Sequence, residues 1–598
     1  MKSTLLSRRD LDFLLFEWLK VDALTDRARY AEHDRSTFEA TLDLCERLAE
    51  QRFAPHNKKS DIHDPHFDGE SVQVISEVKE AIDAFNRSEL LGVGMDSSVG
   101  GSQLPRVVSQ AAFAYFAAAN VSTFGYLLLT LANANLISRF GSRDQVNLFV
   151  KPMLAGRALG TMCLSEPDAG SSLADITTRA EPQDDGSYKL YGSKMWISGG
   201  DHDLSENIIH LVLARIPGGP GGTRGLSLFV VPKYLVNRDG ALGDRNDVVL
   251  AGVNHKMGYR GTVNTVLNFG EGRFTPEGGA GAIGYLVGER HYGLRYMFHM
   301  MNEARLAVGM GATALGYTGY LKSIQYARER PQGRPLDRPG PASAQMPIIG
   351  HPDVKRMLLA QKAYAEGALG LLLYCARLVD IAASPRGDAE AAAANQLLSI
   401  LTPIAKSWPS QWCLEANNLA IQVHGGCGYT REYDVEQHFR DNRLNSIHEG
   451  THGIQGLDLL GRKVSEDRGA LFERLTSVVT ETIVSAIATG GEAAEMATEL
   501  AAHWERLAAV SQVLVSCDNR GVALANSSLY LEAFGHIIVA WVWLQQRNVA
   551  DRGEGDFYAG KRQAARYFFK YELPRTAAQL DLLEQLDRTT VEMEERWF

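Results

Sequence analysis

The chain is poor in the features that mark secreted, metal-binding and thiol-redox proteins. Its six cysteines stand singly, and no two of them have C-x-x-C spacing. A disulfide framework would be far denser in cysteine, and zinc or redox sites need closely spaced pairs. We therefore expect reduced thiols, a cytoplasmic location and no metal site. A G-x-G-x-x-G turn between a strand and a helix is also missing, which disfavours a Rossmann unit.

The sequence also lacks a basic excess and a long apolar run. It has 61 Lys+Arg against 71 Asp+Glu, a formal net charge of -10. Binding to a phosphate backbone needs a basic surface, so nucleic acid is not the expected partner. The longest apolar run, 537–544, is far shorter than the ~20 residues that span a bilayer. We expect no integral membrane association.

The length and composition are those of a globular protein with several domains. Of the 598 residues, 45% are hydrophobic and 22% are charged. A chain of this length exceeds one ordinary core. The apolar periodicity changes from helical to β-like and back to helical, which predicts an α+β multidomain fold. The predicted domains are a helical N-terminal domain (1–158), a middle β-barrel-like domain (159–285), a C-terminal helical bundle (286–462) and a helical extension (463–598).

Turn-rich and turn-poor regions predict the individual elements. Short β-rich runs separated by Gly and Pro predict strands at 188–191, 208–216, 226–231 and 263–269. Helical spacing predicts long helices at 294–329, 351–383 and 390–423, with a linker at 331–352. The charge-poor stretch 107–136 predicts a buried helix pair, and Ser36 with Glu39 resembles a capping box.

Five segments, in order, resemble motifs of the acyl-CoA dehydrogenase flavoprotein family. They are MCLSEPDAGSS (162–172), KMWISGG (194–200), MNEAR (301–305), QVHGGCG (422–428) and IHEGTHGIQ (447–455). The helical tail resembles that of the long bacterial subgroup, which includes enzymes of the fatty acyl-CoA and 3-methylmercaptopropionyl-CoA dehydrogenase types. Five ordered motifs carry far more weight than any single one.

The resemblance implies FAD-dependent α,β-desaturation of a fatty acyl-CoA to the trans-2-enoyl-CoA in β-oxidation. Removing the weakly acidic α-proton needs a positioned carboxylate in a dry site. Glu449 matches the family's base, and its alternative role is that of a surface glutamate. Some members carry the base immediately before the motif arginine, where this chain has Ala304. Glu303 lies one residue further back and, by the ~100° step of a helix, should point elsewhere.

The resemblance also implies which residues bind substrate. Ser171 matches a residue that contacts CoA, although a turn or cap serine is the other interpretation. Arg305 resembles the family's pocket arginine and could instead form a structural salt bridge. His448 replaces the usual tyrosine and could hydrogen-bond the substrate, tune Glu449 if charged, or only pack. The predicted substrate-binding residues are Ser171, Asn302, Arg305, His448 and Gly450.

For FAD, the matching segments lie in the β region and in the bundle. Trp196 would stack beside the flavin ring, unless it is a buried barrel tryptophan. Arg330 and Gln332 would contact the FAD diphosphate of a neighbouring subunit, which implies a homodimer or higher homo-oligomer. The predicted cofactor-binding residues are Met162, Cys163, Leu164, Ser165, Trp196, Ile197, Ser198, Arg330, Gln332, Gln422, Gly425, Gly426, Thr451 and Gly453.

Other functions and partners stay open at the level of sequence. An electron-transferring flavoprotein is the implied acceptor, whereas an oxidase would pass electrons to oxygen. The alternatives to a fatty acyl-CoA dehydrogenase are 3-methylmercaptopropionyl-CoA dehydrogenase and a DNA-binding flavoprotein of the same fold. The acidic tail disfavours the DNA-binding alternative. We interpret the basic-aromatic stretch 561–570 as a solvated helix face, and the tail as a structural domain.

Overall fold

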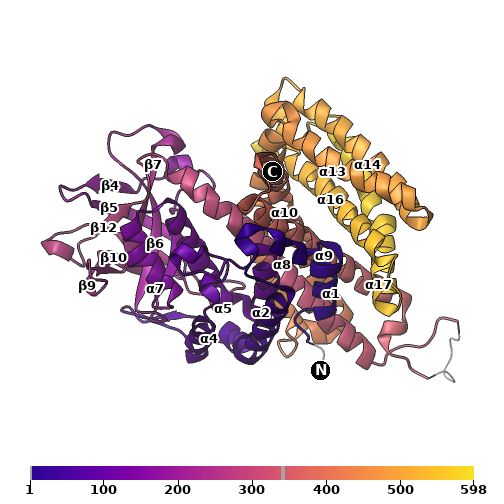
Figure 1. Cartoon of the computed structure of the whole chain (residues 1–598), viewed down its shortest axis with the longest axis horizontal. Coiled ribbons are helices and arrows are strands. Elements are labelled where there is room, and N and C mark those ends of the chain that lie inside the picture. Colours follow the sequence, from indigo (N-terminus) through magenta and orange to yellow (C-terminus); the bar gives the residue numbers. More distant parts are fainter. Residues whose placement is uncertain (1–2, 338–343) are drawn as a thin grey trace. The chain divides into compact units, whose positions relative to one another are not determined.

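The computed structural model describes residues 3–337 and 344–598 (Figure 1). Part of the expected linker, residues 338–343, lies outside these ranges. The chain forms two compact units. The barrel unit comprises Ala40–Leu104 and Ala119–Ala304, and the bundle unit comprises Met1–Glu39, Pro105–Ala118 and Arg305–Phe598. The four domains predicted from sequence divide the chain in another way and stay a prediction.

The barrel unit contains a closed ring of five strands. The ring runs β4 (Arg179–Pro182), β5 (Tyr188–Ser198), β12 (Ala282–Leu286), β7 (Leu226–Pro232), β6 (Asn207–Arg215) and back to β4. β3 (Ala158–Cys163) joins β6 in parallel, while β11 (Asn264–Phe269) and β10 (Val248–Val253) extend the sheet from β5. This closure confirms the barrel-like expectation. β6 and β7 are apolar and almost entirely buried, as central strands are.

The bundle unit is built on three long helices. They are α8 (Gly293–Glu329, from Arg305 onward in this unit), α9 (Pro352–Ala383) and α10 (Asp388–His424). These bounds confirm the helices expected at 294–329, 351–383 and 390–423. α11 (Val435–Arg443) and α12 (His452–Asp458) follow α10 and flank the loop that carries Glu449.

The C-terminal extension belongs to the same unit. Its main helices are α13 (Ala470–Thr489), α14 (Gly491–Val515), α16 (Ser527–Ala550), α17 (Asp556–Tyr567) and α18 (Thr576–Glu584). Trp541 and Trp543 of α16 are fully buried, and Trp543 Nε1 donates to the Ala363 carbonyl of α9 at 3.1 Å. The extension therefore completes the core of the bundle, in agreement with a structural role.

One expectation for the extension is wrong. Lys561 does not lie on a solvated helix face, because its side chain is fully buried. Its ammonium group pairs with Asp10 near the N-terminus and with Glu366 of α9, at 2.9 Å from the latter. The sequence does not distinguish an exposed lysine from a buried one, since a lysine on α17 can either face solvent or pair with buried carboxylates.

In the part of the chain that the structure describes, two helices are long and apolar enough to span a membrane, α5 (Arg106–Phe140) and α16. The most apolar windows are 78% and 83% buried within the protein, respectively, which is the property of core helices. α5 is interrupted at Asn120, where the backbone leaves the helical region with φ -162° and ψ 89°. The non-helical backbone at Asn120 divides α5 into two helical segments, in agreement with the expected helix pair.

The expected capping box at Ser36 and Glu39 is also wrong. Helix α2 (Arg35–Leu48) already begins at Arg35, so Ser36 lies inside the first turn. The cap is Asp34, whose carboxylate accepts from the Thr37 amide at 2.8 Å. Glu39 pairs instead with Arg35, one turn away.

Candidate active site

Two predicted flavin-contacting segments lie side by side in the barrel unit. Residues 162–163 end β3, and 164–165 follow directly. The Met195 amide of β5 donates to the Ser165 carbonyl at 3.0 Å, and Lys194 Nζ donates to the Leu164 carbonyl at 2.9 Å. These bonds attach the residues after β3 to the strand that carries Trp196, Ile197 and Ser198.

Trp196 lies in a β-bulge of β5. The β11 register changes between Thr265, paired with Ile197, and Leu267, paired with Lys194. Trp196 adopts a positive φ of 65° and its side chain is 59% exposed, so it is not a buried barrel tryptophan. Ile197 is buried, and Ser198 Oγ accepts from Asn264 Nδ2 at 3.1 Å. The bulge therefore turns a large aromatic plane outward on a rigid strand, as a stacking contact requires.

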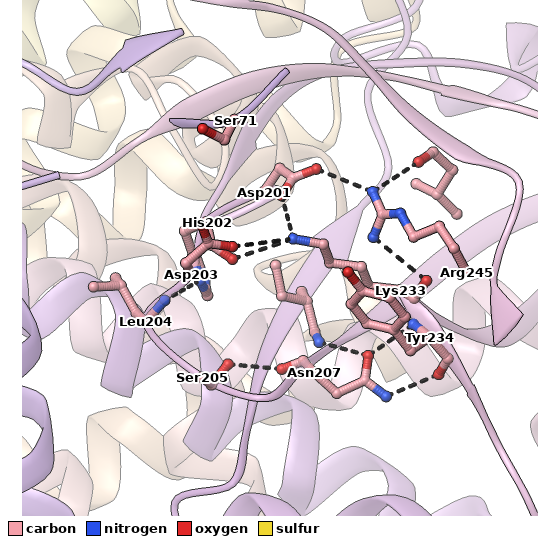
Figure 2. A network of polar contacts seen from close by, with 12 residues as sticks. Ser71, Asp201, His202, Asp203, Leu204, Ser205, Asn207, Lys233, Tyr234 and Arg245 are labelled. Atoms are coloured by element: carbon pink, nitrogen blue, oxygen red, sulfur yellow. Dashed lines mark hydrogen bonds and ion pairs between the residues drawn. The ribbon is translucent and has the colours of Figure 1, made fainter. Parts of the chain in front are cut away.

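A polar network anchors the chain beyond the end of β5 (Figure 2). Asp201 pairs with Lys233 Nζ at 2.5 Å and with Arg245 Nη2 at 3.3 Å. Asn207 Oδ1 accepts from the Tyr234 amide at 2.9 Å in the same network. Ion pairs on both sides of Asp201 fix the residues that follow Ser198, so the bulge is held from both ends.

Glu166 clamps the loop that contains Ser171. Its carboxylate accepts from the Thr177 amide at 2.8 Å and the Thr178 amide at 3.0 Å, and pairs with Lys194 Nζ at 3.0 Å. Burial raises the pKa of Glu166, but Lys194 and the threonine donors outweigh burial and lower the pKa to about 2. Ser171 is exposed on the loop between these anchors. Sequence reasoning missed the clamp, since the motif match alone assigns no partner to Glu166.

In the bundle unit, Glu449 lies in a turn with unusual backbone geometry. Glu449 has φ 54° and Gly450 has φ 95°, and a side chain at Gly450 would lie 2.5 Å from Gln455 Nε2. The same Gln455 amide group donates to the Glu449 carbonyl at 3.1 Å. A left-handed glutamate costs free energy and persists only where neighbours enforce it, which is typical of functional sites.

The charges around Glu449 come from two helices. Arg305 of α8 is buried and pairs with Asp458 of α12 at 3.1 Å. Lys406 of α10 is fully buried and donates to the carbonyls of Asn445 at 2.9 Å and Gly450 at 2.6 Å. Burial raises the pKa of Glu449, whereas the positive charges of Arg305 and Lys406 lower it. The net shift is upward.

A chain of buried amides supports the same loop. Asn417 Nδ2 donates to the Leu315 carbonyl, Asn442 Nδ2 to Asn417 Oδ1 at 2.7 Å, and Asn445 Nδ2 to Asn442 Oδ1 at 3.0 Å. His448 Nε2 lies 3.0 Å from Asn445 Oδ1. Burial, and then Lys406, lower the pKa of His448 to about 3. The imidazole is therefore neutral at pH 7 and does not act on Glu449 as a cation.

The sequence did not identify the residues that support this loop. Lys406 is the one lysine in the mostly apolar stretch 400–413 of α10. A single charged residue in a stretch that is expected to be buried is the sequence signal that could have identified it. The other missed residues are Asn445, Gln455 and Asp458. The alternative base is placed elsewhere: Glu303 Oε2 accepts from Asn135 Nδ2 at 3.2 Å in the barrel unit. Asn302 is exposed in the same turn of α8.

The predicted nucleotide-contacting residues of the bundle unit lie on exposed backbone. Gly425 has φ 60° and ψ -137°, and no atom lies within 4 Å of the position that a side chain would take at Gly425 or Gly426. Gln422 lies in the last turn of α10 and is exposed. Thr451 caps α12, accepting from the Ile454 amide, and Gly453 lies in its first turn. The open glycines allow the close backbone approach that suits a phosphate-bearing ligand.

Arg330 and Gln332 follow α8 and are exposed. Their backbone is fixed by bonds to the return segment, with the Gln332 amide donating to the Met346 carbonyl at 3.0 Å and the Ile348 amide to the Arg330 carbonyl at 2.9 Å. The residues present fit FAD on two observations, the exposed indole of Trp196 and the open glycine pair after α10.

Three family models match the chain. The acyl-CoA dehydrogenase middle-domain model matches residues 161–270, and the acyl-CoA dehydrogenase C-terminal-domain model matches residues 291–464. The acetyl-CoA dehydrogenase C-terminal-like model matches residues 472–594, which cover the helical extension.

Relatives match almost the whole chain. It is 36% identical over 584 residues to 3-methylmercaptopropionyl-CoA dehydrogenase of Ruegeria pomeroyi, covering 96% of each chain. It is 34% identical over 612 residues to a broad-specificity linear acyl-CoA dehydrogenase of Mycobacterium tuberculosis, covering 99% of each. A solved acyl-CoA dehydrogenase of Bacillus anthracis complexed with FAD has the same fold, with a TM-score of 0.72 at 19% identity, over 94% of this chain and 90% of that chain. The chain belongs to the acyl-CoA dehydrogenase family, FAD-dependent oxidoreductases that act on the CH–CH group of their donors.

Proposed function

We propose that this protein desaturates a fatty acyl-CoA to the trans-2-enoyl-CoA in β-oxidation, with Glu449 as the base. The observation that carries the proposal is the setting of Glu449, a carboxylate held in a left-handed turn beside Arg305 and Lys406. Burial raises its pKa and so makes it a stronger base than an exposed glutamate. A base with a pKa nearer to the working pH is a more effective proton acceptor.

The other residues have proposed roles around this step. Bound FAD would supply the acceptor for the hydride that leaves the substrate β-carbon. Glu449 takes the α-proton, and the neutral His448 and Gly450 shape the wall at the thioester end. Ser171 would contact the CoA portion from its clamped loop, and Asn302 and Arg305 are further proposed substrate contacts of their respective units.

The cofactor would be held by two sets of residues. Trp196 would stack on the flavin, with residues 162–165, Ile197 and Ser198 serving its polar edge and surroundings. Gln422, Gly425, Gly426, Thr451 and Gly453 would contact the nucleotide portion. Arg330 and Gln332 would reach the diphosphate of FAD on a second subunit, which supports a homodimer or a higher homo-oligomer. We further propose an electron-transferring flavoprotein as acceptor and a cytoplasmic location, on family resemblance alone.

The substrate could also be 3-methylmercaptopropionyl-CoA, because the 36% identical relative carries that name over 96% of its length. The 34% identical relative is named for linear acyl-CoA substrates of broad range. Anaerobic titration with a series of straight-chain acyl-CoAs and with 3-methylmercaptopropionyl-CoA separates the two. The substrate that bleaches the flavin fastest at equal concentration identifies the preferred acyl group.

The base assignment is tested by Glu449→Gln. The amide keeps the size of the carboxylate but cannot accept the α-proton. General-base catalysis contributes about 10²–10⁴-fold, so single-turnover flavin reduction should fall by at least that factor while FAD and acyl-CoA still bind.

Glu303→Gln is the matched control, because Glu303 lies on the helix that carries the base in some relatives and is bonded to Asn135 here. Glu303→Gln should lower the rate of single-turnover flavin reduction far less than Glu449→Gln does. A Glu303 variant without activity beside a nearly normal Glu449 variant would contradict the assignment.

A further inference from the structure

Lys406 is a buried charge that the proposed reaction does not use. It lies in the middle of α10, and its side chain is fully buried. Its ammonium group donates to two backbone carbonyls, those of Asn445 at 2.9 Å and Gly450 at 2.6 Å. Burying an ammonium group costs free energy even when it is hydrogen-bonded, and an apolar side chain of similar volume would cost less. The position therefore requires a specific reason for a lysine.

The two carbonyls lie on either side of Glu449 in the chain. Asn445 is four residues before it and Gly450 directly follows it. One ammonium group thus connects the start of the loop to the turn in which Glu449 adopts φ 54°. This connection supports the left-handed turn, together with the bond from Gln455 to the Glu449 carbonyl, because glutamate has no intrinsic preference for this region.

The other titratable groups near Glu449 are either paired with another residue or neutral at pH 7. Arg305 on α8 is paired with Asp458 on α12, whose second oxygen accepts from Arg462 Nε at 2.7 Å. His448 is neutral at pH 7, and burial followed by Lys406 lowers the pKa of His452 on α12 to about 4. Lys406 is hydrogen-bonded to carbonyl groups, and the negative charge of Glu449 raises the pKa of its ammonium group.

We propose that Lys406 is a positioning residue for the base: it fixes the turn of Glu449 through two carbonyls and supplies the positive charge that favours its carboxylate. This inference rests on the proposed role of Glu449. Two functions are separable here, because the hydrogen bonds require a donor of any charge and the electrostatic effect requires a cation.

Three variants separate the two functions in the FAD-loaded enzyme. Lys406→Met removes donor and charge, Lys406→Gln keeps a neutral amide donor, and Lys406→Arg keeps the charge with a different geometry. The rate of single-turnover flavin reduction by a straight-chain acyl-CoA is measured against pH, together with exchange of the substrate α-hydrogens in D₂O. Amide hydrogen exchange of residues 445–451 reports the order of the loop without turnover.

We expect the acidic limb of both pH–rate profiles to move to higher pH in the Met and Gln variants. Loss of a nearby opposite charge changes a carboxylate pKa by about one unit or more, and protonation then begins at higher pH. Lys406→Arg should leave the limb in place and lower the limiting rate, since a displacement of about 1 Å costs on the order of 10²-fold. Exchange of the 445–451 amides should be faster in the Met variant than in the parent enzyme.

Lys463→Met is the matched control, a largely buried lysine of the same unit that donates to Ser399 Oγ at 2.6 Å. It should leave the limb unmoved. An unmoved limb in both neutral Lys406 variants would overturn the proposal, and Lys406→Gln carries the test if Lys406→Met does not fold. Glu449→Gln is measured in parallel: if it turned over normally, the base assignment would fail, which is distinguishable from a failure of Lys406 alone.

Discussion

Glu166 is a buried carboxylate whose entire hydrogen-bonding capacity is used within the barrel unit. It joins the residues after β3, the threonines before β4 and Lys194 of β5. Three segments that the sequence separates by up to 28 positions thus meet at one side chain. The S-E-P motif therefore has a structural reason for its glutamate, independent of any ligand.

Replacing Glu166 by Gln should destabilise the protein strongly. The amide leaves Lys194 buried without an opposite charge, and breaking a buried pair in this way costs about 3–5 kcal/mol. The midpoint of chemical unfolding measures the loss. Glu181→Gln is the control, because its pair with Arg179 is 42% and 55% exposed on the two side chains, and such pairs contribute about 0–1 kcal/mol. Equal losses in the two variants would contradict the clamp.

The same pair predicts an acid dependence. The pKa of Glu166 falls from its ordinary value of 4.5 to about 2 in the folded protein. A lowered carboxyl pKa stabilises the fold above pH 4.5, and this contribution disappears as the pH falls from 4.5 towards 2. The parent protein should therefore lose stability over this window more steeply than Glu166→Gln.

The sequence motifs propose ligand-facing side chains but say nothing of the residues that hold them. The ligand roles of Trp196 and Glu449 stay predictions, and no local pattern indicates the positive φ that each residue adopts. Lys406 escapes prediction because it acts through contacts distant in sequence, such as its bond to the Gly450 carbonyl across 44 positions. Long-range hydrogen bonds have no period in the sequence.

A buried lysine links helix α17 to other parts of the bundle unit. Lys561 pairs with Asp10 and Glu366, and its charge also lies 5.3 Å from the ring centre of Trp543. Glu366 is itself paired with Lys362, one turn away on α9. This cluster connects the N-terminal segment, α9 and the extension.

Lys561→Met should therefore destabilise the protein by about 3–5 kcal/mol, because two buried carboxylates lose a shared partner. Differential scanning calorimetry measures the change. Arg566→Met, on the exposed face of the same helix and paired with Glu492, should change the unfolding temperature little. A Lys561 variant as stable as the parent would show that α17 is held by apolar packing alone.

Regular elements were predictable where the apolar pattern is long. The bundle helices agree with their predicted bounds within two residues, because each carries many turns of periodic burial. β3, with the sequence ALGTMC, and β4, with RAEP, were missed because glycine, proline and charge hide their alternation. They become strands only by pairing with β6 and β5, which is a tertiary effect.

The proposed cofactor contacts predict the assembly state. If Arg330 of one subunit contacts FAD of another, the purified protein should contain about one FAD per chain and sediment as a dimer or larger. Arg330→Ala should weaken FAD retention more than it lowers the unfolding temperature, since the side chain is exposed. Arg328→Ala, an exposed arginine two positions earlier on α8, is the control. A monomer that keeps FAD tightly in sedimentation would contradict the shared site.

The two compact units are interleaved along the chain, and this has a consequence for synthesis on the ribosome. The barrel unit is complete once Ala304 has emerged, but the segments Met1–Glu39 and Pro105–Ala118 belong to a unit that needs Arg305–Phe598. At ~5–20 residues per second these two segments remain without their partners for on the order of a minute. The nascent protein is therefore a folded barrel with two unsatisfied helical segments, the kind of intermediate that chaperones shield from aggregation.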